Sequence, residues 1–352
     1  MKRFFTITGL LLALLVVGYM VGPTAHPADV KTEVVKLDPD LINLEQSIAE
    51  SEHKAHLRPD NEARIIWADS SRKVKTPISM IYIPGFSASW AEGDPIHKQL
   101  AKRFGCNLYL ARTYGHGVDT PDALKDITPA NYAASAERAL AIGKELGDKV
   151  VVIGTSAGGM LSLYLAAHHP EIHGLILYSP CIAVANPALK LATKPWGEQI
   201  VRTALGGDYL TNSHYDGERA KYWFPKYHIN GLITLQTMLD QFMTPDQFAK
   251  VKQPLFMGYY YKDEDNQDKV VSVAAMLEMY DALGTPAGQK RKRAFPNTGQ
   301  HVIASHFTSG DLEGVYRETE KFISDVLKLP VVPSTPTSLV APGTAKDRQK
   351  NN

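Results

Sequence analysis

A small polar residue, Ser156, stands between glycines in the stretch Gly154-Thr155-Ser156-Ala157-Gly158. β-Branched residues precede this stretch and an apolar run follows it, which is typical of a strand that turns into a helix. Glycines at 154 and 158 remove the Cβ atoms that would collide in such a tight turn. The spacing predicts a nucleophile elbow, which displays a serine hydroxyl at the carboxyl edge of a sheet. The alternative is a glycine-rich turn whose serine only caps the helix.

A serine nucleophile needs a general base and donors for the developing negative oxygen. The candidate base is His301, because it lies in a loop just after a late predicted strand. The candidate oxyanion donors are the N–H groups of Phe86 and Ala157. Phe86 follows Gly85 at the end of a predicted strand, where a glycine lets the backbone approach a substrate.

A carboxylate after the preceding strand would hold the base in one tautomer. The stretch 262–268 contains several acids, and we expect Asp268 to act because it directly precedes the next predicted helix. Asp263 and Asp265 are the alternatives. The chain order serine, aspartate, histidine is that of one large class of hydrolytic folds.

The elements that must position these residues alternate along the chain. Seven segments are strand-like, and helical patterns lie between most of them. These segments are 63–68, 78–86, 107–113, 149–156, 174–180, 254–262 and 292–297. The stretch beginning Thr128-Pro129 has a typical helix start. Nearly continuous apolar strands that alternate with helices predict an α/β fold with a mostly parallel sheet covered on both faces.

The alternation stops between residues 182 and 251, a segment rich in aromatic and Met side chains with helical stretches and no strong strand. We interpret it as a helical cap over the carboxyl edge of the sheet, where open α/β sheets bind ligands. Trp223, Met238 and Phe242 are its candidate substrate-binding residues, since such side chains form adaptable apolar walls. The alternative is an extension that packs only on itself.

The two ends of the chain differ in composition from its body. Lys2 and Arg3 precede an uncharged apolar run, so residues 1–22 are expected to be a membrane anchor or a signal segment. In either case the protein would be exported, with an anchored form placing its body outside the cytoplasm. Residues 23–61 read as a stalk with one short helix, 62–181 and 252–329 as the core, and 330–352 as a disordered tail.

Composition excludes several classes of function. The 352 residues carry a net charge of +1, which gives no reason to expect a nucleic-acid partner. Two cysteines cannot build a disulfide framework or a cysteine metal site. No metal-binding or nucleotide-binding motif appears, so neither a metal nor another cofactor is expected.

Taken together, these motifs resemble the α/β-hydrolase superfamily, and within it the capped esterases and monoacylglycerol-lipase-like members of the serine aminopeptidase group (S33 type). The stretches that carry the resemblance are GTSAGG, PGFSAS, ARTYGHGV, DKVVS and NTGQHVI. The resemblance implies an α/β-hydrolase fold with a helical cap inserted after strand 6. It also implies Ser156 as nucleophile, Phe86 as oxyanion donor, Asp268 as the acid and a structural role for His116.

Two features depart from the family pattern. Pro84 stands where most members have a histidine that steadies the oxyanion loop, and the stretch 262–268 is longer than usual.

The predicted function is that of a serine hydrolase cleaving carboxylic esters with an apolar acyl or aryl group. The alternatives are an aminopeptidase, amidase or thioesterase on the same triad, or a binding protein without turnover, which Pro84 favours.

Overall fold

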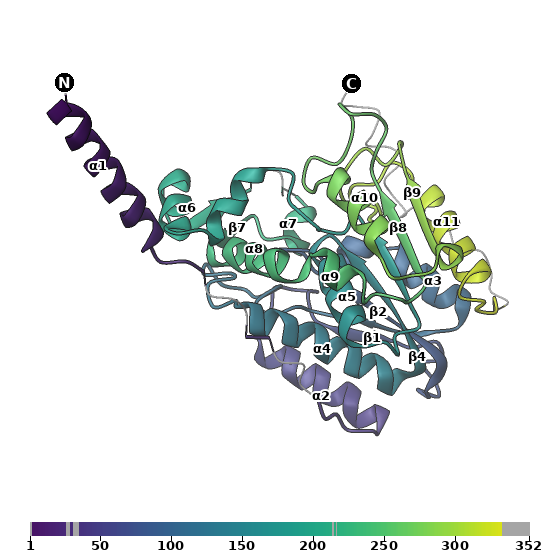
Figure 1. Cartoon of the computed structure of the whole chain (residues 1–352). Coiled ribbons are helices and arrows are strands. Elements are labelled where there is room, and N and C mark those ends of the chain that lie inside the picture. The colour runs from purple at the N-terminus through teal and green to yellow at the C-terminus, as the bar shows by residue number, and fades with distance from the viewer. Residues whose placement is uncertain (1, 26–28, 31–34, 213–214, 216, 333–352) are drawn as a thin grey trace.

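The computed structural model describes residues 2–25, 29–30, 35–212, 215 and 217–332 (Figure 1). A seven-stranded sheet forms its centre, in the order β1-β3-β2-β4-β5-β8-β9. Its strands are β1 (Arg64–Ile66), β2 (Thr76–Ile83), β3 (Asn107–Leu110), β4 (Gly147–Thr155), β5 (Gly174–Tyr178), β8 (Leu255–Tyr259) and β9 (Lys290–Ala294). Every neighbouring pair is parallel except β1 with β3, so the predicted mostly parallel sheet is confirmed.

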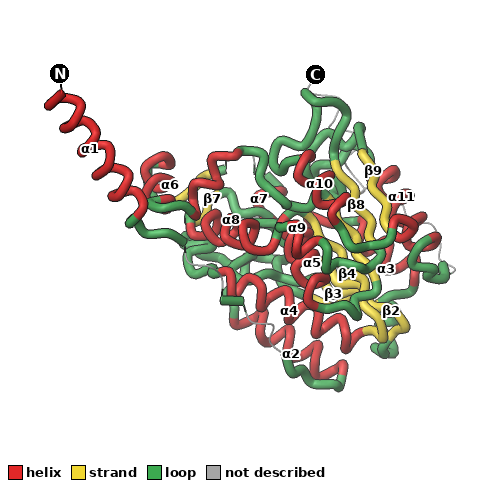
Figure 2. The backbone as a smooth tube through the Cα atoms, viewed as in Figure 1, coloured by secondary structure: helices red, strands yellow, loops and turns green. Residues whose placement is uncertain are grey.

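Successive strand residues face opposite sides of this sheet and enter two separate cores. Ile81 and Ile83 of β2 belong to one core, whereas Met80 and Tyr82 belong to the other. The first core is covered by α2 (Leu41–Lys54), α4 (Pro129–Leu146), α5 (Ala157–His168) and α10 (Val273–Ala282), the second by α3 (Ile96–Phe104) and α11 (Leu312–Asp325). Figure 2 shows the strands in the middle with helices around them.

The predicted start of α4 is confirmed. The Thr128 side chain accepts the backbone N–H of Asn131, and the Asn131 side chain accepts the N–H of Thr128 in return. Pro129 then opens the helix, where its missing N–H costs nothing.

The segment between β5 and β8 forms the cap. Its elements are η2 (Pro187–Thr193), α6 (Gly197–Leu205), β6 (Tyr209–Thr211), α7 (Arg219–Tyr222), β7 (Lys226–His228), α8 (Asn230–Phe242) and α9 (Pro245–Phe248). β6 and β7 pair antiparallel, a ribbon that the sequence did not predict because three-residue strands carry no readable alternation. The cap follows β5, the fifth strand among the described residues.

The short helix expected in a stalk, α2, lies against the body. Leu44 and Ile48 on one face of it are buried in the first core, four residues apart as a helix requires. The proposed boundaries at 23, 61, 182 and 251 otherwise remain predictions. The predicted disordered tail lies outside the described residues from residue 333 onward.

The N-terminal helix α1 (Lys2–Met20) projects away from the body (Figure 1). Trp196 of the cap contacts its end, donating from Nε1 to the Gly18 carbonyl at 3.0 Å. Within the part of the chain that the structure describes, no helix combines the length and the apolar character needed to cross a bilayer. The expected transmembrane anchor is therefore not supported.

Candidate active site

The turn between β4 and α5 is strained at Ser156. Its φ of 53° and ψ of −118° lie in a region that residues other than glycine rarely adopt. A Cβ at Gly158 would overlap the carbonyl oxygen of Ile83, and one at Gly154 would overlap that of Gly158. Only glycine fits at either position, which explains the spacing seen in the sequence.

The side chain of Ser156 makes no capping hydrogen bond to α5. Its backbone holds the turn instead: the N–H donates to the Tyr178 carbonyl at 2.9 Å, and the carbonyl accepts the N–H groups of Gly159 and Cys181. The residue is 8% exposed. The alternative of a serine that only caps the helix is therefore excluded, and the hydroxyl stands at the carboxyl edge of the sheet.

Asp268 and His301 are hydrogen-bonded to each other. His301 Nδ1 lies 2.6 Å from Asp268 Oδ2, while Asp268 Oδ1 accepts the N–H groups of Val270 and Val271. Burial alone would raise the pKa of Asp268, but His301 and the two amides outweigh it and lower that pKa. Burial alone would lower the pKa of His301, and the charge and hydrogen bond of Asp268 raise it above the usual value.

The alternative acids lie in a tight turn away from His301. Asp263 is exposed and accepts hydrogen bonds from the backbone N–H groups of Asp265 and Asn266. The Lys262 N–H donates to the Asn266 carbonyl and closes the turn. The additional length of 262–268 is thus taken up by this turn, and of the three acids it is Asp268 that the structure brings to His301.

The elbow and the Asp268–His301 pair meet at β5. Ser179, which directly follows Tyr178, donates from Oγ to the backbone carbonyl of His301 at 2.8 Å. Tyr178 in turn accepts the N–H of Ser156. Among the described residues, the buried Nε2 of His301 has no hydrogen-bond partner. The structure thus places the serine and the pair at one edge of the sheet without a hydrogen bond between Ser156 and His301.

The stretch that follows β2, residues 85–89, lies beside the elbow, and we call it the oxyanion loop. A Cβ at Gly85 would lie 3.1 Å from Cβ of Ser156, so Phe86 immediately follows a residue in contact with the serine. Ala157 is the first residue of α5, where backbone N–H groups have no intrahelical acceptor. In the described part of the chain neither the Phe86 N–H nor the Ala157 N–H makes a hydrogen bond, so both can serve a ligand.

His116 supports the oxyanion loop from the side. Its ring is buried, receives an edge contact from Phe86 at 6.0 Å between ring centroids, and stacks on Tyr132 at 5.7 Å. Burial lowers its pKa to about 4, so it is neutral. These contacts agree with the structural role expected for this residue.

Trp223 joins the cap to the oxyanion loop. The Ser89 N–H donates to the Tyr222 carbonyl at 2.9 Å, and the Phe224 N–H donates to the Ser87 carbonyl at 3.0 Å. Ala88 and Trp223 pair between these two bonds as an antiparallel bridge. The Trp223 side chain is 1% exposed and packs with Ala88 and Val302, the residue after His301. The cap therefore meets the site through its backbone as well as its side chains.

Met238 and Phe242 lie elsewhere in the cap. Phe242 contacts Tyr164 and His168 at ring distances of 4.9 and 6.2 Å. Tyr164 is eight residues after Ser156, about 12 Å along α5. Met238 is fully buried in the first core. The structure does not bring these two residues together with Trp223, and a pocket formed by all three stays a prediction.

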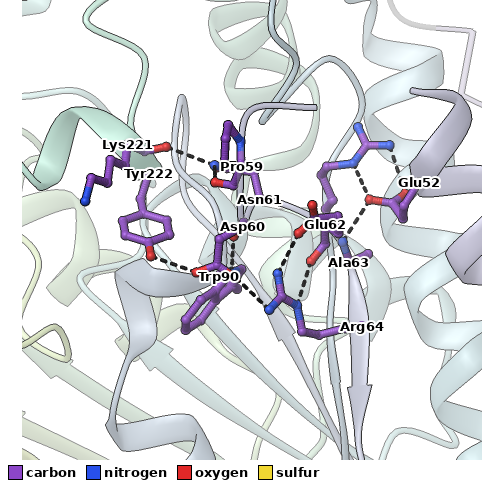
Figure 3. Close-up of polar contacts among 11 residues, drawn as sticks. Glu52, Pro59, Asp60, Asn61, Glu62, Ala63, Arg64, Trp90, Lys221 and Tyr222 are labelled. Carbon is purple, nitrogen blue, oxygen red and sulfur yellow. Dashed lines mark hydrogen bonds and ion pairs between the residues drawn. The ribbon is translucent and has the colours of Figure 1, made fainter. Parts of the chain in front are cut away.

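Residues 58–61 fasten the cap segment that carries Trp223. Figure 3 shows the part of these contacts that Asp60 and Asn61 make with Lys221, Tyr222 and Trp90. The Tyr222 hydroxyl donates to the Asp60 carboxylate at 2.7 Å, and the Asn61 amide donates to the Lys221 carbonyl at 2.9 Å. Trp90, in η1 (Trp90–Gly93), donates from its indole to the Asp60 carbonyl at 2.7 Å. Asp60 thereby binds both Tyr222 of the cap and Trp90 of η1.

Glu92, also in η1, is a site residue that the sequence did not reveal. It is 2% exposed, and its Oε2 accepts hydrogen bonds from the Gly85 N–H and the Tyr82 hydroxyl. Burial raises its pKa to about 7. In the sequence it stands in the polar stretch SWAEGD, which resembles a solvated turn. Among the described residues, no cluster of His, Cys, Asp and Glu is arranged to hold a metal ion.

Residues 80–312 match the model of the alpha/beta hydrolase family. The chain belongs to this family. A thermostable monoacylglycerol lipase from Bacillus sp. (strain H-257) is 30% identical over 122 residues, which make up 35% of this chain. The match spans about half of that curated relative, 47% of its length.

Solved structures share the fold. One, described with LipS and LipT, two metagenome-derived lipolytic enzymes, superposes with a TM-score of 0.60 at 21% identity, covering 76% of this chain and 98% of its own. The monoacylglycerol lipase of Paleococcus ferrophilus gives 0.54 at 14% identity, covering 76% and 100%. At these identities the likeness establishes the alpha/beta hydrolase fold.

Proposed function

We propose that this protein is a serine hydrolase that cleaves carboxylic esters through an acyl-enzyme. The observation that carries the proposal is the buried Asp268–His301 pair, whose Oδ2 and Nδ1 atoms are 2.6 Å apart. It lies at the same sheet edge as Ser156, which stands in a strained turn and whose side chain makes no capping hydrogen bond. A histidine whose free Nε2 has no partner is suited to take a proton from a nearby hydroxyl.

The reaction would follow the usual course for such a triad. His301 Nε2 takes the proton of Ser156 Oγ, which attacks the ester carbonyl, and the N–H groups of Phe86 and Ala157 hold the resulting oxyanion. His301 then gives the proton to the leaving alcohol. Water, activated by the same histidine, hydrolyses the acyl-enzyme and restores Ser156. Asp268 keeps Nδ1 protonated throughout, so that Nε2 is the acceptor.

An apolar ester is the proposed substrate class. The relative with 30% identity is a monoacylglycerol lipase, and structures with the same fold come from lipolytic enzymes. The aromatic residues of the cap beside the oxyanion loop agree with an apolar acyl or aryl group. Amides and thioesters react through the same intermediate and are the alternative substrates, and a binding protein without turnover is the alternative function.

Labelling with a fluorophosphonate probe tests the mechanism. The wild type should be labelled covalently and should hydrolyse p-nitrophenyl esters, and Ser156→Ala should do neither while melting at the same temperature. Ser162→Ala is the matched control, because Ser162 lies in the same helix and donates only to the Gly158 carbonyl. An unlabelled wild type would indicate a binding protein, and labelling that survives in Ser156→Ala would assign the nucleophile elsewhere.

Export from the cytoplasm is also a proposal. It rests on the basic residues Lys2 and Arg3 followed by an apolar run. Fractionation of cells expressing the whole chain, with Lys2→Glu/Arg3→Glu as the comparison, tests it. Wild-type protein confined to the cytoplasmic fraction would contradict it.

A further inference from the structure

Groups from three parts of the fold meet at the Glu92 carboxylate. The Gly85 N–H of the oxyanion loop and the Tyr82 hydroxyl of β2, at 3.2 Å, donate to it, and the Trp223 side chain of the cap acts on its pKa. A Cβ at Gly85 would lie 2.6 Å from Oε1 of Glu92 and 3.1 Å from Cβ of Ser156. Gly85 is therefore in contact with the buried carboxylate and with the serine at once.

The oxyanion loop has few other means of holding its first residues. Pro84 has no N–H and no polar side chain, and Ser87 takes a positive φ of 64°. Ser87 and Ser89 are bonded to the cap backbone, which fixes the far end of the loop. At the near end, the Gly85 N–H bond to Glu92 fixes the Pro84–Gly85 peptide plane, and the Ala88 N–H, which donates to the Gly85 carbonyl at 3.2 Å, holds the next plane, which carries the Phe86 N–H. The Glu92 carboxylate therefore anchors the residue from which the proposed Phe86 donor extends.

Glu92 and His301 act on each other electrostatically. The titratable groups that act with Glu92 are Tyr82 of β2, Tyr132 of α4, Tyr215 of the cap and His301. Of these only His301 becomes a cation near neutral pH. Above its pKa of about 7 Glu92 is ionised, and its charge then raises the pKa of His301, in addition to the larger effect of Asp268.

We propose that Glu92 is a positioning residue of this site: it aims the oxyanion loop through Gly85 and supplies a second carboxylate that stabilises the imidazolium of His301. The inference rests on the proposed hydrolase function. The tyrosines around Glu92 stay neutral, and its hydrogen bonds hold it in one place, so the two effects act together when Ser156 gives up its proton.

Glu92→Gln is the informative substitution, because the amide keeps the shape and one acceptor but removes the charge. We expect kcat, and the rate of fluorophosphonate labelling, to fall on the order of tenfold, with KM nearly unchanged. The acid limb of the pH profile should move to lower pH, since His301 loses one of the charges that raise its pKa.

Glu52→Gln is the matched control. Glu52 is also a buried carboxylate that accepts a backbone N–H, from Ala63 at 2.8 Å, but it pairs with Arg112 and lies outside the site. Its replacement should lower the melting temperature and leave kcat and the pH profile as in the wild type. If Glu92→Gln changes neither kcat nor the acid limb of the pH profile, the proposal is overturned. It is also overturned if kcat falls while the acid limb stays in place, because that result marks a merely structural residue.

If Glu92→Gln does not fold, Glu92→Asp is tested instead. It keeps the charge, but its side chain is one methylene shorter, so the carboxylate lies farther from Gly85. A reduced kcat with a wild-type acid limb supports the proposal, and a wild-type kcat overturns it. The parent function is tested separately: a wild type labelled at Ser156 upholds it whatever Glu92 does. A wild type that is never labelled removes both.

Discussion

Asp268 holds His301 from one side only: Oδ2 lies 2.6 Å from Nδ1, and Oδ1 is occupied by the Val270 and Val271 amides. Asp268→Asn keeps this shape but can hold the imidazole in the wrong tautomer. We expect kcat to fall by up to about 10⁴-fold, the loss known for such a change in another triad. Steady-state hydrolysis of a p-nitrophenyl ester measures it.

Asp263→Asn and Asp265→Asn are the controls for that substitution. Both residues lie in the exposed turn, and we expect each variant to retain kcat within about twofold. A dead Asp263→Asn beside an active Asp268→Asn would reassign the acid.

The raised pKa of Glu92 makes stability depend on pH. The folded-state value is about 7 against an ordinary 4.5, so the folded protein binds more protons than the unfolded chain between these values. The contribution of Glu92 to the free energy of unfolding is therefore largest below pH 4.5 and is lost as the pH rises through 7. The melting temperature of Glu92→Gln minus that of the wild type at the same pH should therefore be higher at pH 8 than at pH 5. A constant difference across that range would contradict a shifted carboxyl.

Gly158→Ala should unfold the elbow. The added methyl group would overlap the Ile83 carbonyl, which belongs to a central strand and cannot move freely. We expect a loss of at least about 2 kcal/mol in the free energy of unfolding, measured by urea denaturation. Gly288→Ala, in η3 (Ala287–Gln289), is the control because a Cβ there meets nothing within 4 Å. Equal effects at the two positions would contradict this account of the motif.

Trp223→Ala separates two roles for the cap. Loss of this buried side chain should lower the free energy of unfolding by about 3–5 kcal/mol. If Trp223 also lines the acyl pocket, kcat/KM should rise with acyl chain length in the wild type and rise less in the variant. A chain-length series from acetate to medium-chain esters, with melting temperatures alongside, measures both. A parallel loss for all esters would leave Trp223 as a support of the oxyanion loop.

The sheet and the serine turn could be predicted because their signals are local. Apolar strands and the glycine spacing around Ser156 depend on residues within one turn, and the helix start at Thr128-Pro129 does as well. The choice of Asp268 over Asp263 rested on a neighbouring helix start, and the contact with His301 agrees with it.

What could not be predicted depends on distant partners. Glu92 is buried because Tyr82, Gly85 and Trp223 surround it, and Trp223 lies far along the chain. Residues 23–61 are polar enough to suggest a stalk, yet Leu44 and Ile48 find a place in the core. β6 and β7 of the cap are stabilised by pairing with each other across a loop, and each strand is too short to show a pattern of its own.

The cap of this protein is not a module that can be exchanged for that of a relative. Its backbone at 220–224 receives Arg58 and Asn61 from one side and the Ser89 N–H from the other. A chimera that imports a foreign segment at 182–251 and lacks matching acceptors would leave the buried Asn61 amide and Ser89 N–H unpaired, each at a cost of about 1–3 kcal/mol. Substrate range in this chain is therefore better altered by single side chains within the cap, or by grafting residues 58–61 and 85–92 together with the new segment.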